Sequence, residues 1–177
     1  MEGDRVGTRY LSGLELAHRI SQRLPEAVVD ANPEWVEVRP DDLVEVCRFL
    51  RDDEETDFKF LSCLTAVDRL DHFEVVYHLQ SFRLNQLGVL KVKVWDREEP
   101  EVPSVTSVWL GADLQEREAY DLMGIRFRGH PDLRRLFLWE GFPGHPLRKD
   151  WLAMPGQRMP GLQRFPGEPG EPDTGRG

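Results

Sequence analysis

Apolar positions near the N-terminal end of the chain recur with the period of a helix. Ser12 opens a capping-box pattern with Glu15, and Pro25 marks the end of the stretch. The apolar side chains expected to share one face are Leu14, Ala17, Ile20 and Leu24. A face of this size needs a partner layer, so the pattern predicts a first helix that packs on the rest of the domain.

The next stretch predicts a short strand and a second helix. The strand is expected at 35–38, and Pro40 suits the first turn of the helix because proline lacks the N–H that this position does not use. Leu43, Cys47 and Leu50 fall on one helical stripe. The charged run at 51–55 is expected to close the helix in an exposed stretch.

In the middle of the chain, the spacing of apolar residues changes from the helical period of 3.6 to the period of 2 that is typical of a strand. Residues 73–80 and 90–94 alternate in polarity and predict two half-buried strands, joined by a hairpin loop from Ser81 to Gly88. The apolar stretch before them, 60–67, predicts a more central strand. Helices followed by an antiparallel meander predict an α+β fold of two layers, with helices packed on one face of a mainly antiparallel sheet.

The last third of the chain predicts a short helix and then an extended arm. The helix is expected from Asp113, as its capping residue with Glu116 at the third position, to Met123, with Gly124 after it. Residues 141–151 hold too much proline and glycine for a regular element, and their aromatic and basic side chains are expected to face outward as an interface. These side chains are Phe142, Leu147, Arg148 and Trp151.

The chain is expected to form one domain. Residues 1–113 make an α+β body, and residues 114–151 add a signature helix and a docking arm to the same domain. The last 26 residues, 152–177, contain 5 prolines and 6 glycines, so we expect a disordered tail or an arm that orders on a partner.

Composition narrows the class of protein. The net charge of −9, concentrated in residues 1–113 with a net charge of −10, argues against nucleic acid as a partner. No run approaches the roughly 18 apolar residues of a membrane span, and the polar N-terminus lacks the features of a signal peptide, so the cytoplasmic side is expected. Cys47 and Cys63 are too few for a cysteine-ligated iron–sulfur cluster and are expected to be small buried hydrophobes.

Ionisable residues are densest between 116 and 135. On a helix, Arg117 and Asp121 are four residues apart and Glu118 and Asp121 are three apart, so two carboxylates could share acid–base work. No nucleophile with a neighbouring base, nucleotide-binding glycine loop or metal-ligand spacing around His130 and His145 accompanies them. An ion-pair network at a protein interface is the favoured interpretation, and an acid–base site is the alternative.

The segment 116–135, EREAYDLMGIRFRGHPDLRR, resembles the signature of the complex I 30 kDa subunit family, the C-type subunit of bacterial NADH-quinone oxidoreductase. Residues 144–150, GHPLRKD, are similar to a second block of that family. Residues 64–68, 75–79 and 102–106 are similar to its sheet and exit loop, so the resemblance covers roughly 30–151. Met123 stands where an aromatic residue is usual, and 136–144 lacks an aspartate that members often carry.

The resemblance implies a non-catalytic subunit of the peripheral arm of a proton-translocating NADH:quinone oxidoreductase, on the cytoplasmic face of the membrane. It implies partners, chiefly the quinone-site large subunit, which is of the D type, and the neighbouring iron–sulfur subunits. FMN, iron–sulfur clusters and quinone would lie on those other subunits, and no cofactor on this chain. An equivalent subunit of a membrane-bound hydrogenase, or of a complex fed by ferredoxin or F420, is the nearer alternative. A small soluble enzyme using Glu118 and Asp121 is a remote one.

The expected partner interface combines the signature helix with the arm. Its residues are Glu116, Arg117, Glu118, Asp121, His130, Arg134, Arg135, His145, Arg148, Lys149, Asp150 and Trp151.

Overall fold

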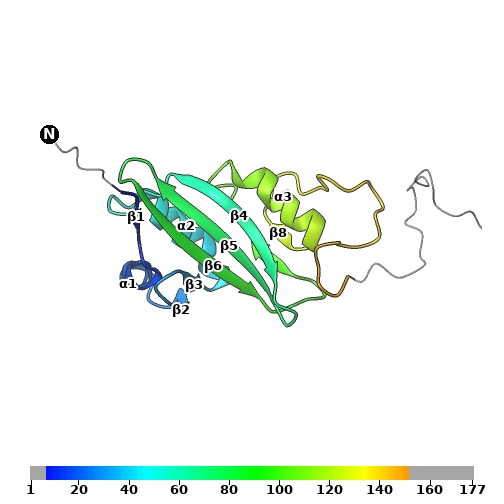
Figure 1. The fold of residues 1–177 in the computed structure, drawn as a ribbon, viewed down its shortest axis with the longest axis horizontal. Helices are drawn as coiled ribbons and strands as arrows, with labels where there is room; N and C mark the ends of the chain where they lie inside the picture. The colour runs from blue at the N-terminus through cyan, green and yellow to red at the C-terminus, as the bar shows by residue number, and fades with distance from the viewer. Residues whose placement is uncertain (1–6, 152–177) are drawn as a thin grey trace, which may run out of the picture.

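The computed structural model describes residues 7–151, and the expected tail at 152–177 lies outside the described residues. Six strands form one mixed sheet in the order β2-β3-β6-β5-β4, with β1 pairing with β6 off this path (Figure 1). The strands are β1 (Arg9–Tyr10), β2 (Val28–Ala31), β3 (Val36–Val38), β4 (Phe60–Asp68), β5 (Phe73–Ser81) and β6 (Gln86–Val94). Strands β4, β5 and β6 form an antiparallel meander, whereas β1 and β3 run parallel to β6.

The first helix, α1 (Gly13–Arg23), begins with the predicted capping box. The Ser12 hydroxyl accepts the backbone N–H of Glu15, and the Glu15 side chain accepts the N–H of Ser12. The prediction that Leu14 lies on the buried face is wrong, because that side chain is 53% exposed. The buried face includes Gly13, which lies so close to the Trp35 carbonyl that a Cβ would stand 1.9 Å from its oxygen.

The second helix also follows its predicted stripe. A 3-10 turn, η1 (Pro40–Asp42), leads into α2 (Leu43–Asp52), and Leu43, Cys47 and Leu50 are all fully buried. The prediction that Cys47 is a small buried hydrophobe is confirmed, and this burial raises the pKa of its thiol. The same prediction is wrong for Cys63, which is exposed on β4.

The core lies on one face of the sheet. The register of β5 and β6 pairs Phe73 with Val94, Val75 with Val92, and Tyr77 with Leu90. All six side chains belong to a single core cluster. Apolar residues of α1, α2 and the third helix belong to the same cluster, and α1 and the third helix lie on opposite sides of the molecule in the view of Figure 1. The fold is therefore the predicted α+β arrangement of helices packed on a mainly antiparallel sheet.

Three predictions about the strands need correction. Strand β4 was expected to be more central but is an edge strand. Strand β5 is buried on both faces in its first half, where Glu74, on the face opposite the core, is covered by Arg69 and Lys91, which pair with it. The hairpin loop is shorter than predicted, since β5 extends to Ser81 and β6 starts at Gln86.

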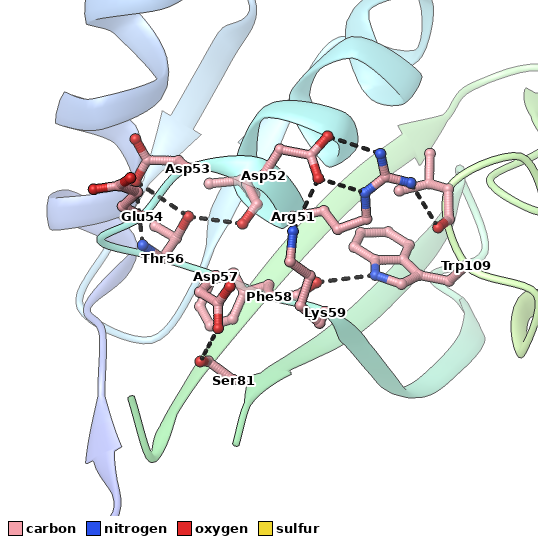
Figure 2. A network of polar contacts seen from close by, with 12 residues as sticks. Arg51, Asp52, Asp53, Glu54, Thr56, Asp57, Phe58, Lys59, Ser81 and Trp109 are labelled. Carbon is pink, nitrogen blue, oxygen red and sulfur yellow. Dashed lines mark hydrogen bonds and ion pairs between the residues drawn. The ribbon is translucent and has the colours of Figure 1, made fainter. Parts of the chain in front are cut away.

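The loop between α2 and β4 is bonded to several segments (Figure 2). The Thr56 hydroxyl donates to the Leu50 carbonyl at 2.7 Å, and the Ser81 hydroxyl donates to the Asp57 carboxylate at 3.1 Å. The Trp109 indole N–H donates to the Phe58 carbonyl at 2.9 Å. These bonds fix the loop against the β5–β6 hairpin and against the segment that precedes the third helix.

The chain then forms β7 (Glu101–Pro103), α3 (Ala112–Met123) and β8 (Arg126–Arg128), and β7 and β8 pair in parallel. The prediction that Asp113 caps α3 is wrong, because the N-cap is Gly111, which has no side chain to accept a bond. Gly124 ends the helix as predicted, with a left-handed φ of 74° that glycine adopts without strain. Among residues 7–151, no helix is long and apolar enough to cross a membrane.

Candidate functional site

The carboxylate of Asp121, in the last turn of α3, organises the segment that follows the helix. It accepts the backbone N–H groups of Leu136, Phe137 and Leu138 at 2.7 to 3.0 Å. Arg135 Nη1 donates a fourth bond at 3.0 Å, and the Asp121 side chain is fully buried. Burial alone would raise the pKa of Asp121, but these donors outweigh it and hold the pKa below its ordinary value. Asp121 is therefore a buried anion whose acceptor positions are occupied within the chain.

Two arginines extend this attachment by donating to backbone carbonyls. Arg135 donates to the carbonyl oxygens of Phe142 and Gly144 at 3.1 and 3.3 Å. Arg117 Nε donates to the carbonyl of Arg134 at 3.2 Å. Since a coil without regular structure has few partners for its own carbonyls, these side chains supply them.

The end of α3 is capped by side chains from the arm. His145 Nδ1 lies 2.9 Å from the Asp121 carbonyl oxygen, and Arg148 Nε donates to the Met123 carbonyl at 2.7 Å. Both pack so closely on Gly124 that a Cβ there would stand 2.6 Å from the His145 ring. Burial lowers the pKa of His145, which favours the neutral ring, with Nδ1–H as the donor. Last-turn carbonyls of a helix lack partners within it, so these two residues satisfy them.

A separate ion cluster fastens the end of the described chain to the sheet. Arg97 bonds Asp68, at the end of β4, at 2.7 Å and Asp150 at 2.8 Å. The Lys149 N–H donates to the other Asp68 oxygen at 2.9 Å. Burial would raise the pKa of Asp68, yet Arg97 and the backbone donors hold it well below its usual range. The sequence carries no signal for this contact, because Asp68 and Asp150 are far apart along the chain.

The first half of α3 carries a second fully buried carboxylate, Glu116. It accepts the Ser104 hydroxyl at 2.6 Å and the Val105 N–H at 2.7 Å, and thereby holds the exit loop that follows β7. Burial, and to a smaller extent the nearby Asp113 charge, raise the pKa of Glu116 to about 7, although the two hydrogen bonds act to lower it. Glu116 is thus a carboxyl group that titrates near neutrality.

The structure divides the predicted interface residues into two groups. The buried and half-buried side chains that bond within the chain are Glu116, Arg117, Asp121, His130, Arg135, His145 and Arg148. The His130 side chain is fully buried, and its Nε2 atom lies 3.2 Å from the Asp113 carbonyl oxygen. The exposed residues are Glu118, Arg134, Lys149 and Asp150, while Trp151 is half-buried.

The arm does not face outward as the sequence suggested. Phe142 is buried between the rings of Trp139 and Trp151, and Arg148 turns inward over the Phe73 ring. Leu147 is the one of the four expected outward residues that is well exposed, at 55%. The inward residues close the irregular segment upon itself, which a proline- and glycine-rich coil needs to hold a shape.

Other apolar side chains take the outward positions. Phe137 is 64% exposed and Trp139 is 42% exposed, within the stretch that Asp121 anchors. Leu147 joins Leu122 and Glu118 on the wall of a shallow groove between α3 and β4. Sequence reasoning missed Phe137 and Trp139. The signal that could have found them is an apolar run, 136–139, in a segment that forms no regular element.

The proposed acid–base pair is not assembled. Asp121 uses its oxygens for four internal donors and keeps a lowered pKa, whereas Glu118 lies exposed beside the groove. A general acid–base pair needs two carboxyl groups that reach a common ligand. Asp121 instead holds a segment that presents apolar side chains.

A family model described as the respiratory-chain NADH dehydrogenase 30 Kd subunit matches residues 36–156. The C-type subunit of NADH-quinone oxidoreductase from Roseiflexus sp. (strain RS-1) is 46% identical over 148 residues, covering 79% of this chain and 84% of that protein. The second C-type subunit of NADH-quinone oxidoreductase from Rhizobium meliloti (strain 1021) is 50% identical over 117 residues, covering 64% of this chain and 63% of that protein.

A solved structure shares the fold. A chain of the membrane-bound sulfane sulfur reductase, an archaeal respiratory membrane complex, aligns with a TM-score of 0.64 over 81% of this chain and 87% of that chain. Its sequence identity of 24% supports the fold alone. The family match, by contrast, spans most of the sheet, α3 and the segment that Asp121 anchors. On this evidence the chain belongs to the family of the 30 kDa subunit of the respiratory-chain NADH dehydrogenase.

Proposed function

We propose that this chain is a non-catalytic subunit of the peripheral arm of a proton-translocating NADH:quinone oxidoreductase, on the cytoplasmic face of the membrane. In this role it docks on the quinone-site large subunit and on neighbouring iron–sulfur subunits. Electrons pass from NADH through FMN and iron–sulfur clusters to quinone on those other chains. The proposal is supported by family membership and by curated relatives, at 42–50% identity, that are named as C-type subunits of NADH-quinone oxidoreductase.

The observation that carries the docking role is the shape of the segment 133–151. Its backbone is held by Asp121 and Arg135, so the segment keeps one conformation without regular secondary structure. It exposes Phe137, Trp139 and Leu147 to solvent. Exposed aromatic and aliphatic side chains on a rigid support are typical of the centre of a protein interface, because little conformational entropy is lost when they are buried.

The polar residues of the expected interface then have two different tasks. The exposed charges of Glu118, Arg134 and Lys149 suit the rim, where they steer and orient the partner. The buried residues position the segment and do not contact the partner. Arg148→Glu and Trp151→Ala would therefore weaken assembly by deforming the segment, not by removing a contact.

The docking role is tested by replacing the exposed apolar side chains. We expect Phe137→Ser with Leu147→Ser to abolish most co-purification of the quinone-site large subunit and to lower the membrane NADH:quinone activity in parallel. The matched control is Phe82→Ser on the β5–β6 hairpin, where the side chain is 68% exposed and distant from α3. Surface changes of this kind alter stability by about 0.5 kcal/mol or less, so both variants should melt like the unmodified chain.

Equal recovery of the large subunit with the double variant and with the Phe82→Ser control would contradict this docking surface. Loss of recovery with Phe82→Ser alone would move the interface to the hairpin end of the sheet.

A further inference from the structure

Glu116 is fully buried in the core. Cys47 from α2 and Tyr77 from β5, both fully buried, interact with it electrostatically, and Asp113 adds a negative charge from α3. In the described part of the chain, Glu116 forms no ion pair, and the Tyr77 hydroxyl has no hydrogen-bond partner. A buried carboxylate without a cation is costly, so this environment favours the protonated acid.

Two hydroxyl groups lie in series between Glu116 and the surface. Glu116 Oε2 lies 2.6 Å from Ser104 Oγ, and Ser104 Oγ lies 2.8 Å from Thr106 Oγ1. Exposure rises along this path from none at Glu116, through 7% at Ser104, to a half-buried Thr106. Each hydroxyl can donate one hydrogen bond while it accepts others, so the same oxygen positions serve a protonated and an ionised Glu116.

The loop that carries these hydroxyls is fixed at both ends. The Ser104 N–H donates to the Arg128 carbonyl at 2.9 Å, at the end of β8. At the other end, Arg51 donates to the Val108 carbonyl at 3.1 Å and Trp109 donates to Phe58 (Figure 2). The short oxygen–oxygen distances therefore belong to a rigid loop and not to a chance approach.

We propose that Glu116 is a proton-binding site that exchanges its proton with solvent through the hydroxyl groups of Thr106 and Ser104. In the loading step, a hydronium ion gives a proton to Thr106 Oγ1 and becomes water, the Thr106 proton passes to Ser104 Oγ, and the Ser104 proton passes to Glu116 Oε2. Both hydroxyls keep one proton each, and the carboxylate becomes a carboxylic acid. The site is filled and emptied as the pH passes through neutrality.

The proposal is independent of the docking role and is tested on the purified 177-residue chain by infrared spectroscopy. The carboxylic acid C=O band of Glu116, identified by its loss in Glu116→Gln, is expected to titrate with a midpoint near 7 instead of the ordinary value of 4.5. On transfer to heavy water, the shift of this band reports how fast the acid proton exchanges. Glutamine keeps the size and hydrogen-bonding capacity of the acid, so the reference variant is expected to fold.

Thr106→Val removes one hydroxyl at nearly constant volume, and Thr106→Ser keeps it. We expect Thr106→Val to slow the exchange by roughly tenfold or more, because the proton must then wait for local opening of the loop, whereas Thr106→Ser exchanges like the unmodified chain. Ser104→Ala should slow exchange similarly, and Ser107→Ala, outside the hydroxyl path, should not. A midpoint near 4.5, or equal exchange in the valine and serine variants, would overturn the proposal.

Discussion

The two buried carboxylates of α3 have pKa values that are shifted in opposite directions, although they lie only five residues apart on one helix. Glu116 receives two neutral donors, and burial raises its pKa to about 7. Asp121 receives three backbone N–H groups and the guanidinium of Arg135, and its pKa is lowered. Both side chains are closed off from solvent, but Asp121 has twice as many donors as Glu116 and one of them is a cation, so Asp121 stays ionised against its desolvation.

The two carboxylates also hold different parts of the molecule. Glu116 attaches the exit loop after β7, which lies within the body of the domain. Asp121 attaches the segment that we propose as the docking surface. A permanent anion suits the second task, because an attachment made of charge-assisted hydrogen bonds stays intact throughout the physiological pH range.

The largest effect is expected from Asp121→Ala. This change leaves Arg135 and three partly buried N–H groups without their acceptor, and it should lower the free energy of unfolding by about 3–5 kcal/mol. Amide hydrogen exchange should rise throughout 133–151. Asp132→Ala, which removes an exposed carboxylate just before the anchored stretch, should leave the denaturation curve and the exchange pattern unchanged. Equal destabilisation by the two alanines would show that Asp121 does not anchor the segment.

Glu116→Gln should stabilise the protein, and the gain in the free energy of unfolding should depend on pH. Because the folded pKa of Glu116 is above its ordinary 4.5, its stabilisation is complete below pH 4.5 and is lost as pH rises to about 7. The lost stability is about 3 kcal/mol over this window, at about 1.4 kcal/mol per pKa unit. Glutamine cannot ionise, so the variant should gain by that amount relative to the parent between acid and neutral pH in urea titrations. If the variant lost stability relative to the parent as pH rises, or if the difference did not change with pH, a raised pKa of Glu116 in the folded state would be excluded.

The smallest effect is expected from a comparison of the half-buried Arg135 with the exposed Arg134. Arg135→Gln removes the cationic donor of Asp121 and should lower the free energy of unfolding by about 1.5–3 kcal/mol. It should also bring the pKa of Asp121 closer to its ordinary value. Arg134→Gln serves as the control, because the exposed Arg134 side chain bonds the exposed Asp132 side chain. If both arginine variants unfold alike in a thermal melt, the guanidinium is not what separates Asp121 from Glu116.

Local patterns in the sequence predicted the regular elements well. The capping box at Ser12, the stripe of α2 and the glycine that ends α3 depend on neighbours within a few residues, so they can be read without the fold. The position of β4 could not be read, because an apolar strand can lie at an edge when a helix covers it, as α3 does here. The exposure of Cys63 follows from the same edge position.

The sequence by itself determined that 116–151 holds a cluster of carboxylates, arginines and aromatic residues in a helix followed by an irregular segment. Only the tertiary structure decided which carboxylate is ionised and which side chains face solvent. The donors of Asp121 stand fourteen to seventeen residues away, and the neighbours of Glu116 come from α2, β5 and the exit loop. Whether a side chain is protonated or exposed depends on such neighbours, which are distant in sequence. Helix capping and periodicity depend on a few adjacent residues.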